Sequence, residues 1–170
     1  MLNIPNLRSV SAISPGVLGQ TGIETAEIIR GLVDKTKPSV VIAIDALASR
    51  KLSRLGNTLQ IADTGIAPGS GVGNGRSALN QETLGVPVIS IGIPTVVDAA
   101  TLTIDILEST GMKPDEAKIR DAVKPGEYSM MVTPREIDTL VEHAANTIAM
   151  AINKALYPTL STEDIGSLVS

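Results

Sequence analysis

The sequence predicts an α/β protein, a three-layer α/β/α sandwich around a mainly parallel sheet of about five strands. Residues 40–44 (Val-Val-Ile-Ala-Ile) form a continuous apolar run rich in β-branched side chains, which is typical of a strand covered on both faces. Further strand-like runs alternate with segments of helical spacing along the chain. We expect one domain over residues 1–170, with a loose tail over residues 158–170.

The N-terminal residues predict a strand and a helix ahead of this run. Residues 10–13 are a short apolar segment followed by turn residues. The pattern Thr21-Gly22-Ile23-Glu24 matches a capping box, so we expect a helix to begin at Thr21 with Glu24 reaching back to its amide. With residues 40–44, this order predicts a right-handed strand–helix–strand unit.

Residues 46–55 leave two interpretations open. They are good helix formers, which predicts a short solvated helix. They also carry a local positive patch, and the alternative is that Arg50 neutralises nearby acids or binds a substrate carboxylate. Residues 58–62 then predict a second strand.

The second half of the chain continues the alternation. Residues 77–84 predict one or two helical turns, residues 86–91 a strand that ends at Gly92, and residues 95–109 a helix. Residues 111–128 are polar, contain two prolines and predict a connecting loop with little structure.

The last predicted helix has the clearest pattern. It follows a short strand at residues 130–132 and begins with a second capping box, Thr133-Pro134-Arg135-Glu136. Apolar residues then recur at spacings of three and four, which predicts one buried face. These residues are Ile137, Leu140, Val141, Ala144, Ala145, Ile148, Ile152 and Leu156.

Composition excludes several kinds of function. The chain has no cysteine, which excludes a disulfide framework, a thiolate nucleophile and cysteine-ligated metal sites. It has two tyrosines, no other aromatic residue and a net charge of −4, which argues against direct binding of nucleic acid. The single histidine, His143, is expected on the last helix at the edge of its apolar face, in a surface or boundary packing role. No apolar stretch reaches the roughly 20 residues of a membrane span, so we expect an intracellular protein with no cofactor and no metal.

Two aspartates stand at the ends of predicted strands. Asp45 follows residues 40–44 and Asp63 follows residues 58–62. Open α/β sheets place ligands at the carboxyl ends of their strands, and two facing carboxylates can share a proton during hydrolysis. Asp63 could be the partner of Asp45 if their strands are neighbours. The alternative for each is structural: Asp45 caps the next segment, and Asp63 accepts hydrogen bonds from its own turn.

A glycine-rich loop follows the second aspartate. Its candidate binding residues are Gly69, Ser70, Gly71, Gly73 and Asn74. Backbone amides in such a loop can cradle an anion or form an oxyanion hole. The loop is neither a P-loop nor a complete dinucleotide-binding fingerprint, and a flexible connection is the alternative.

Several long segments resemble the germination protease family of spore-forming bacteria. The resemblance rests on Ser-Pro-Gly-Val-Leu-Gly and its continuation, on Ile-Asp-Ala-Leu-Ala around Asp45, and on Pro-Gly-Ser-Gly-Val-Gly-Asn in the glycine loop. The full set of segments is residues 14–25, 41–48, 60–66, 68–74, 92–99 and 131–138.

This resemblance implies an endopeptidase that degrades small acid-soluble, DNA-protecting spore proteins during germination. It implies an atypical aspartic peptidase with two catalytic aspartates, related in fold to hydrogenase maturation proteases. Asp45 matches the second of these aspartates. The resemblance further implies a protein substrate, no membrane partner, a homo-oligomer and a location in the spore core.

The chain departs from the family pattern in two respects. The family's first catalytic aspartate lies upstream of the Ser-Pro-Gly-Val-Leu-Gly segment, so we expect a C-terminal part of a longer protein, without its N-terminal segment and inactive alone. The connection from residue 109 to 128 is also shorter than in the family. The alternatives are a non-catalytic anion-binding module and a metal-dependent maturation-type protease with Asp45 as an oxygen ligand.

Overall fold

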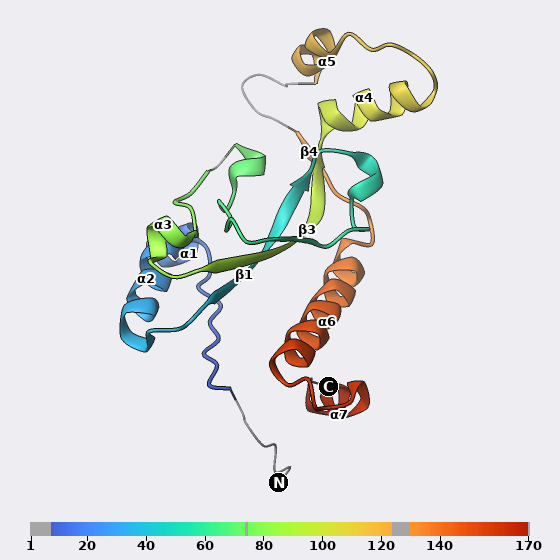
Figure 1. Ribbon diagram of the computed structural model, residues 1–170. Coiled ribbons are helices and arrows are strands. Elements are labelled where there is room, and N and C mark those ends of the chain that lie inside the picture. Colours follow the sequence, from blue (N-terminus) through green and yellow to red (C-terminus); the bar gives the residue numbers. More distant parts are fainter. Residues whose placement is uncertain (1–7, 74, 124–129, 170) are drawn as a thin grey trace. The chain divides into compact units, whose positions relative to one another are not determined.

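The computed structural model describes residues 8–73, 75–123 and 130–169. Contacts divide the chain into two compact units: Pro15–Ile137, and Met1–Ser14 together with Asp138–Ser170. The unit Pro15–Ile137 contains the sheet and is the part that positions the candidate site (Figure 1). Within the described residues, no helix is both long and apolar enough to cross a membrane.

The sheet is built around one long central strand. Strand β3 (Val88–Asp98) lies between β1 (Val41–Ser49) and β2 (Gln60–Ala62), and β4 (Met131–Val132) pairs with its C-terminal end. The longest pairing, β1 with β3, is parallel, whereas β2 and β4 run antiparallel to β3. This confirms the predicted α/β class, with four strands in the described residues rather than about five.

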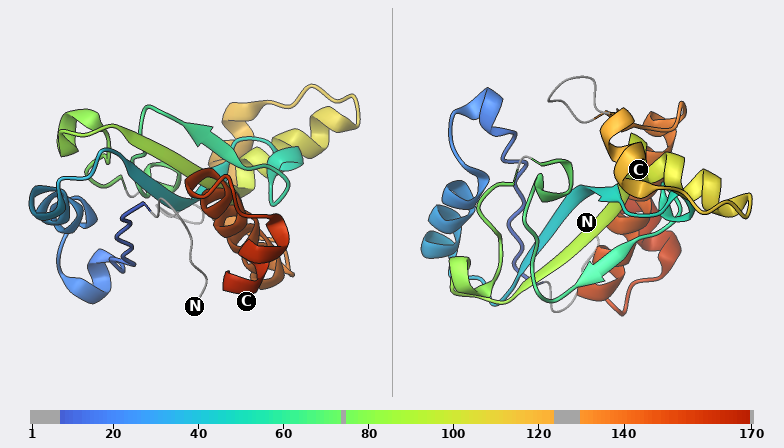
Figure 2. Two further views of the ribbon diagram at one scale, coloured as in Figure 1. Left: turned by 60° about the horizontal axis from the view of Figure 1, so that its bottom comes forward. Right: turned by 90° about the horizontal axis from the view of Figure 1, so that it is seen from above.

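Helices gather at the two ends of this sheet. Figure 2 shows α2 (Thr25–Thr36) and α3 (Gln81–Leu84) together where β1 begins, and α4 (Ala99–Ser109) with α5 (Glu116–Ala122) where β3 ends. The short elements are α1 (Leu18–Thr21) and the 3-10 turns η1 (Leu52–Arg54) and η2 (Ser70–Val72). The second unit consists mainly of α6, which starts at the boundary (Ile137–Leu156), and α7 (Thr162–Val169).

One face of the sheet is buried and the other is exposed. Leu79, Leu84 and Val88 form a buried cluster, against which side chains of α2 and β1 pack. On β3 the buried face continues through Ser90, Gly92 and Pro94. The opposite face carries four exposed isoleucines, Ile42, Ile44, Ile61 and Ile89.

Two predicted strand boundaries are wrong for a shared reason. β1 continues to Ser49, so Asp45 lies in the middle of the strand, and residues 46–49 do not form a helix. β3 continues through Pro94 to Asp98, because a register shift lets Leu47 pair with Pro94 and Ala48 with Val96. Strand pairing therefore overrides the helix propensity of residues 46–49 and the break expected at Gly92.

The N-terminal predictions also differ from the structure. Residues 10–13 form no strand, and Val10 and Ile13 are 59% and 50% exposed. Thr21 ends α1 rather than starting a helix, because Gly22 follows it in the left-handed conformation (φ 68°). Helix α2 starts at Thr25, without a side-chain cap. The predicted strand–helix–strand unit is therefore absent from this part of the described chain.

The C-terminal predictions are correct in part. β4 confirms the strand at residues 130–132, although it begins at Met131. The second capping box is wrong, because α6 begins at Ile137 and the Thr133 hydroxyl donates to the Thr95 carbonyl (2.8 Å). Of the predicted apolar face of α6, only Ala144 and Ile148 are buried. The predicted loop contains α5, and its residues 124–128 lie outside the described chain. Where a loose tail is expected, the structure has α7.

Candidate functional site

Asp45 lies in the middle of β1, on its buried face. It is paired in register with Gly92, and Val41 and Ala43 precede it on the same face. Its carboxylate accepts a hydrogen bond from the backbone N–H of Ala46 (2.9 Å). Partial burial raises the pKa of Asp45 above its ordinary value, although the hydrogen bond from Ala46 opposes this. The structure thus provides a half-buried carboxyl group that gains a proton more easily than an exposed aspartate.

Gly92, at the position opposite Asp45, leaves room for the Leu47 side chain. A Cβ atom on Gly92 would lie 2.5 Å from the Cδ1 atom of Leu47. The Leu47 side chain therefore lies directly on the backbone of β3 at Gly92, the residue paired with Asp45.

Asp63 does not lie beside Asp45. β3 separates the strand before Asp63 from β1, which puts roughly 10 Å between the two outer backbones. Asp63 is also exposed, and in the described residues its side chain takes part in no hydrogen bond, so the predicted turn interaction is absent. The condition for a partnership, that the two strands are neighbours, is therefore not met, and the structure does not bring these two carboxylates together.

The glycine loop is held tightly against β1. Gly69 and Gly73 flank η2 in the left-handed conformation, both with φ of 72°, which explains glycine at these positions. A Cβ atom on Gly71 would lie 2.8 Å from the Cβ atom of Ala48, so only glycine permits this close approach. Asn74 lies outside the described residues.

Much of the loop's hydrogen-bonding capacity is used within the loop. The N–H of Ser70 donates to the Ala67 carbonyl (3.2 Å), and the N–H of Gly73 donates to the Ser70 carbonyl (3.5 Å). The N–H of Arg76 closes the loop on the Pro68 carbonyl (3.0 Å). The predicted anion cradle therefore loses two of its donors, which leaves the Ser70 hydroxyl and the Gly71 amide as the better candidates for substrate contact.

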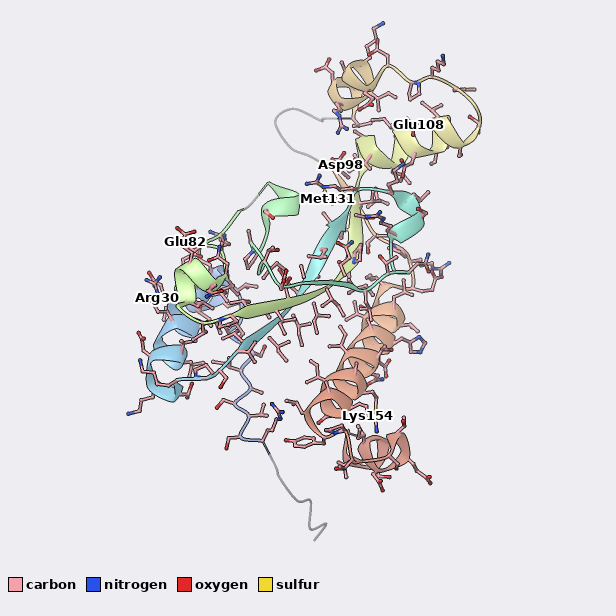
Figure 3. The ribbon with its side chains drawn as sticks, in the orientation of Figure 1. Arg30, Glu82, Asp98, Glu108, Met131 and Lys154 are labelled. Carbon is pink, nitrogen blue, oxygen red and sulfur yellow. The ribbon has the colours of Figure 1, made fainter. Side chains whose placement is uncertain are left out.

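A cleft of about 570 Å³ joins several of the predicted residues. We call it the β1–α4 cleft. It is lined by residues 48–51 at the end of β1, by Ser70 and Gly71, and by parts of α4 and α5. Figure 3 shows Asp98 at the start of α4 and Glu108 towards its end, and both residues line the cleft. The structure thus brings Arg50 together with Ser70 and Gly71, which the sequence alone could not establish. Asp45 is not part of the cleft lining.

Sequence reasoning missed the contribution of α4 to this cleft. Thr101, Asp105 and Glu108 all line it. Their spacing of four and three residues puts them on one face of the helix, so a polar stripe was available as a signal. Asp98 caps the start of α4, because its carboxylate accepts from the amides of Ala100 (3.0 Å) and Thr101 (3.1 Å).

No metal centre is evident in the part of the chain that the structure describes. Those residues contain no group of three or more His, Asp or Glu side chains that could hold a metal ion. His143 is exposed on α6, consistent with a surface position.

Comparison with known proteins gives a consistent family assignment. A model of the family described as "Germination protease" matches residues 5–110 and 106–169. Germination protease from Caldanaerobacter subterraneus subsp. tengcongensis is 47% identical over 184 residues, covering 96% of this chain and 57% of the relative. The Clostridium tetani protein is 47% identical over 193 residues, covering 98% and 60%. A Clostridium perfringens protein is 46% identical over 186 residues, covering 97% and 57%.

The chain spans less than two thirds of the length of these relatives, at 57–60%. Each alignment is also longer than the 170 residues of the chain. The two matched stretches of the family model meet at residues 106–110, in the last turn of α4. These observations indicate that the relatives carry additional residues near the end of α4, beside the β1–α4 cleft.

Proposed function

The chain belongs to the germination protease family, and on this premise we propose that it forms part of an endopeptidase that acts on small acid-soluble spore proteins in the spore core. The observation that carries the proposal is the half-buried carboxyl group of Asp45, in the segment that most resembles the family's catalytic motif. Its position on a strand of a paired sheet holds it rigidly, as a reacting group requires.

Asp45 is suited to proton transfer in peptide hydrolysis. A general acid or base works best when its pKa lies near the working pH, and burial moves the pKa of Asp45 in that direction. In the proposed reaction, the ionised carboxylate takes a proton from an attacking water, and the carboxylic acid returns a proton to the leaving amine.

An aspartic-type mechanism pairs two carboxyl groups. Burial, rather than a neighbouring carboxylate of the described residues, raises the pKa of Asp45. The proposal therefore gives Asp63 no part in the proton transfer and expects the second carboxyl group outside the described residues.

The glycine loop has a supporting role in this proposal. Its seat against Ala48 places Ser70 and Gly71 at one wall of the β1–α4 cleft. We expect this wall to contact the substrate chain away from the reacting bond, because Asp45 is not among the cleft residues.

The test is cleavage of a purified small acid-soluble spore protein, followed by mass-spectrometric peptide mapping. The enzyme assayed is a family member of the full length of the curated relatives that contains this chain. We expect its cleavage activity to be lost in Asp45→Asn and retained in Asp63→Asn. Equal activity of Asp45→Asn and the unmodified enzyme would show that the reaction does not use this carboxyl group.

We also propose that the protein assembles with copies of itself. The support is the exposed face of the sheet, on which Ile42, Ile44 and Ile61 are 38%, 56% and 71% exposed. Contiguous apolar surface of this kind is typical of interaction sites in soluble proteins.

A further inference from the structure

We propose that Leu47 is a positioning residue for Asp45: its side chain, which rests on Gly92, holds the Asp45 carboxyl group in one orientation and keeps water from one side of it. This inference rests on the proposed function, because it takes Asp45 as the reacting carboxyl group, and it adds the residue that orients that group. The observations that carry it come from two neighbouring strands, β1 and β3, on the buried face of the sheet.

The Asp45 carboxylate has little polar support. Within the described residues it accepts one hydrogen bond, from the backbone N–H of Ala46 (2.9 Å), the next residue of the same strand. Burial and this bond are the two influences on the pKa of Asp45, so no charged group of the described residues contributes to it. A carboxyl group without a polar partner on another element takes its orientation from the side chains that pack around it.

Leu47 extends along β3 in the direction of Asp45. It follows Asp45 by two residues and therefore points to the same face of the sheet. Leu47 pairs with Pro94, whereas Asp45 pairs with Gly92. A Cβ atom on Gly92 would lie 2.5, 2.6 and 3.0 Å from the Cδ1, Cγ and Cδ2 atoms of Leu47. The branched end of Leu47 thus lies at the level of Asp45, and neighbouring strands about 4.8 Å apart put it within reach of the carboxyl group.

Hydrogen bonds restrain β3 at the next pairs. The register shifts by one residue directly after Leu47, which marks a β-bulge. The carbonyls of the bulge are bound from outside β1 and β3: Pro94 accepts from the N–H of Gly56 (2.8 Å), and Thr95 accepts from the hydroxyl of Thr133 (2.8 Å). A side chain at position 92 would therefore have to displace Leu47 rather than the strand.

Shortening Leu47 should expose the carboxyl group of Asp45. Leu47→Ala removes the branched end that lies at this level, so water should reach the carboxyl group. The pKa of Asp45 should then fall towards its ordinary value of 3.8, because burial is what raises it. Leu47→Val removes one methylene group and should give a smaller fall, and it serves as the test if the alanine variant does not fold.

The first experiment measures this titration without any substrate. The 13C resonance of the Asp45 carboxyl group is followed by NMR through the acidic to neutral range. Ile44→Ala is the matched control, since Ile44 is an isomer of leucine next to Asp45 on the same strand but is 56% exposed on the opposite face. We expect the titration midpoint to fall in Leu47→Ala and to stay unchanged in Ile44→Ala. An unchanged midpoint in Leu47→Ala, or an equal fall in Ile44→Ala, overturns the inference.

A double-variant comparison tests the role of Gly92. Gly92→Ala puts a Cβ atom where the branched end of Leu47 lies, so it should displace this side chain and change the midpoint. When Leu47→Ala is already present, adding Gly92→Ala should have little further effect. Gly31→Ala is the matched control, because no atom beyond the backbone of its own helix lies within 4 Å of the added Cβ. Additive effects of the two substitutions would show that Gly92 does not hold Leu47.

A cleavage experiment separates this inference from the proposed function. A family member of the full length of the curated relatives that contains this chain is assayed on a small acid-soluble spore protein. A positioning role predicts that Leu47→Ala lowers kcat by roughly 10–100-fold with little change in KM, because the reacting group and not substrate binding is affected. The acidic limb of the pH profile of kcat/KM should also move to lower pH.

The outcomes of this assay are distinct. Ile44→Ala should change neither kcat nor the pH profile. A rise in KM alone for Leu47→Ala, with the pH profile unmoved, would contradict the positioning role. Full activity in Asp45→Asn would instead contradict the proposed function, and the NMR titration would still decide whether Leu47 determines the environment of Asp45.

Discussion

Asp45 combines two properties that rarely coincide: it lies on the buried face of a strand, and it is an ionisable group. Residues 40–44 identified the strand, and Asp45 directly after them identified the carboxylate, both from sequence alone. The side of the strand that Asp45 occupies and its position in mid-strand depend on pairing with β3, which no local pattern shows. Because β3 lies between β1 and β2, the distance between Asp63 and Asp45 could not be predicted from sequence either.

The raised pKa of Asp45 predicts how stability changes with pH. The folded state holds the proton more tightly than the unfolded state, so the stabilising contribution is present at pH values below the ordinary pKa of 3.8. It is lost as the pH rises through the folded-state pKa. An asparagine side chain does not ionise, so Asp45→Asn should not lose stability as the pH rises. We therefore expect its Tm to exceed that of the unmodified chain at neutral pH.

The measurement is thermal unfolding of both proteins across the acidic to neutral range. Asp63→Asn is the control, and its Tm difference should not follow the same trend. A Tm gap between Asp45→Asn and the unmodified chain that stays constant across this range would contradict the burial argument.

Helices and turns show most clearly what sequence patterns can and cannot predict. The helix predicted over residues 95–109 is present, but it begins only at Ala99, where the carboxylate of Asp98 accepts from the amides of Ala100 and Thr101. Both predicted capping boxes are wrong, because Thr21 and Thr133 make other bonds: Thr21 to the Val17 and Ile23 carbonyls, and Thr133 to a distant carbonyl on β3. A threonine hydroxyl can thus bond several carbonyls near and far, and the sequence pattern does not show which one it takes.

Gly65 supports a prediction about the connection between β2 and α3. It has φ of 81°, and a Cβ atom there would lie 2.1 Å from the backbone carbonyl oxygen of Leu79. Gly65→Ala should therefore combine backbone strain with a clash that no side chain can relieve, a loss of about 2–4 kcal/mol in the free energy of unfolding.

Gly111→Ala is the matched control for this change. Gly111 has the same φ of 81°, but no atom lies within 4 Å of the added Cβ. Its substitution should cost only the strain, about 1–2 kcal/mol. Urea unfolding of both variants measures the difference, and equal losses would show that the Leu79 contact is not the cause.

At the scale of the whole molecule, the α/β class was predictable because it depends on the alternation of segments, which survives errors in their boundaries. The β1–α4 cleft was not predictable. It is assembled from residues around positions 50, 70, 105 and 116, and only the folded chain brings these together. Its α5 wall was expected to be loop, although residues 116–122 form a helix.

The exposed isoleucine face predicts self-association. Ile61 is 71% exposed, so Ile61→Ser removes little buried surface and should change the free energy of unfolding by less than about 0.5 kcal/mol. If this face joins two copies, the variant should have a lower mass than the unmodified protein by light scattering at the same concentration. An unchanged mass would remove this face from the proposed assembly.

The most direct test of the central claim compares two aspartates in one assay. Peptide bond cleavage in a small acid-soluble spore protein is followed by mass spectrometry for the active enzyme, for Asp45→Asn and for Asp63→Asn. We predict that Asp45→Asn lowers kcat/KM by about 10²–10⁴-fold, as expected for loss of an acid–base group, while Asp63→Asn remains close to the unmodified enzyme. Full activity in Asp45→Asn, in a protein that folds normally, would contradict the account.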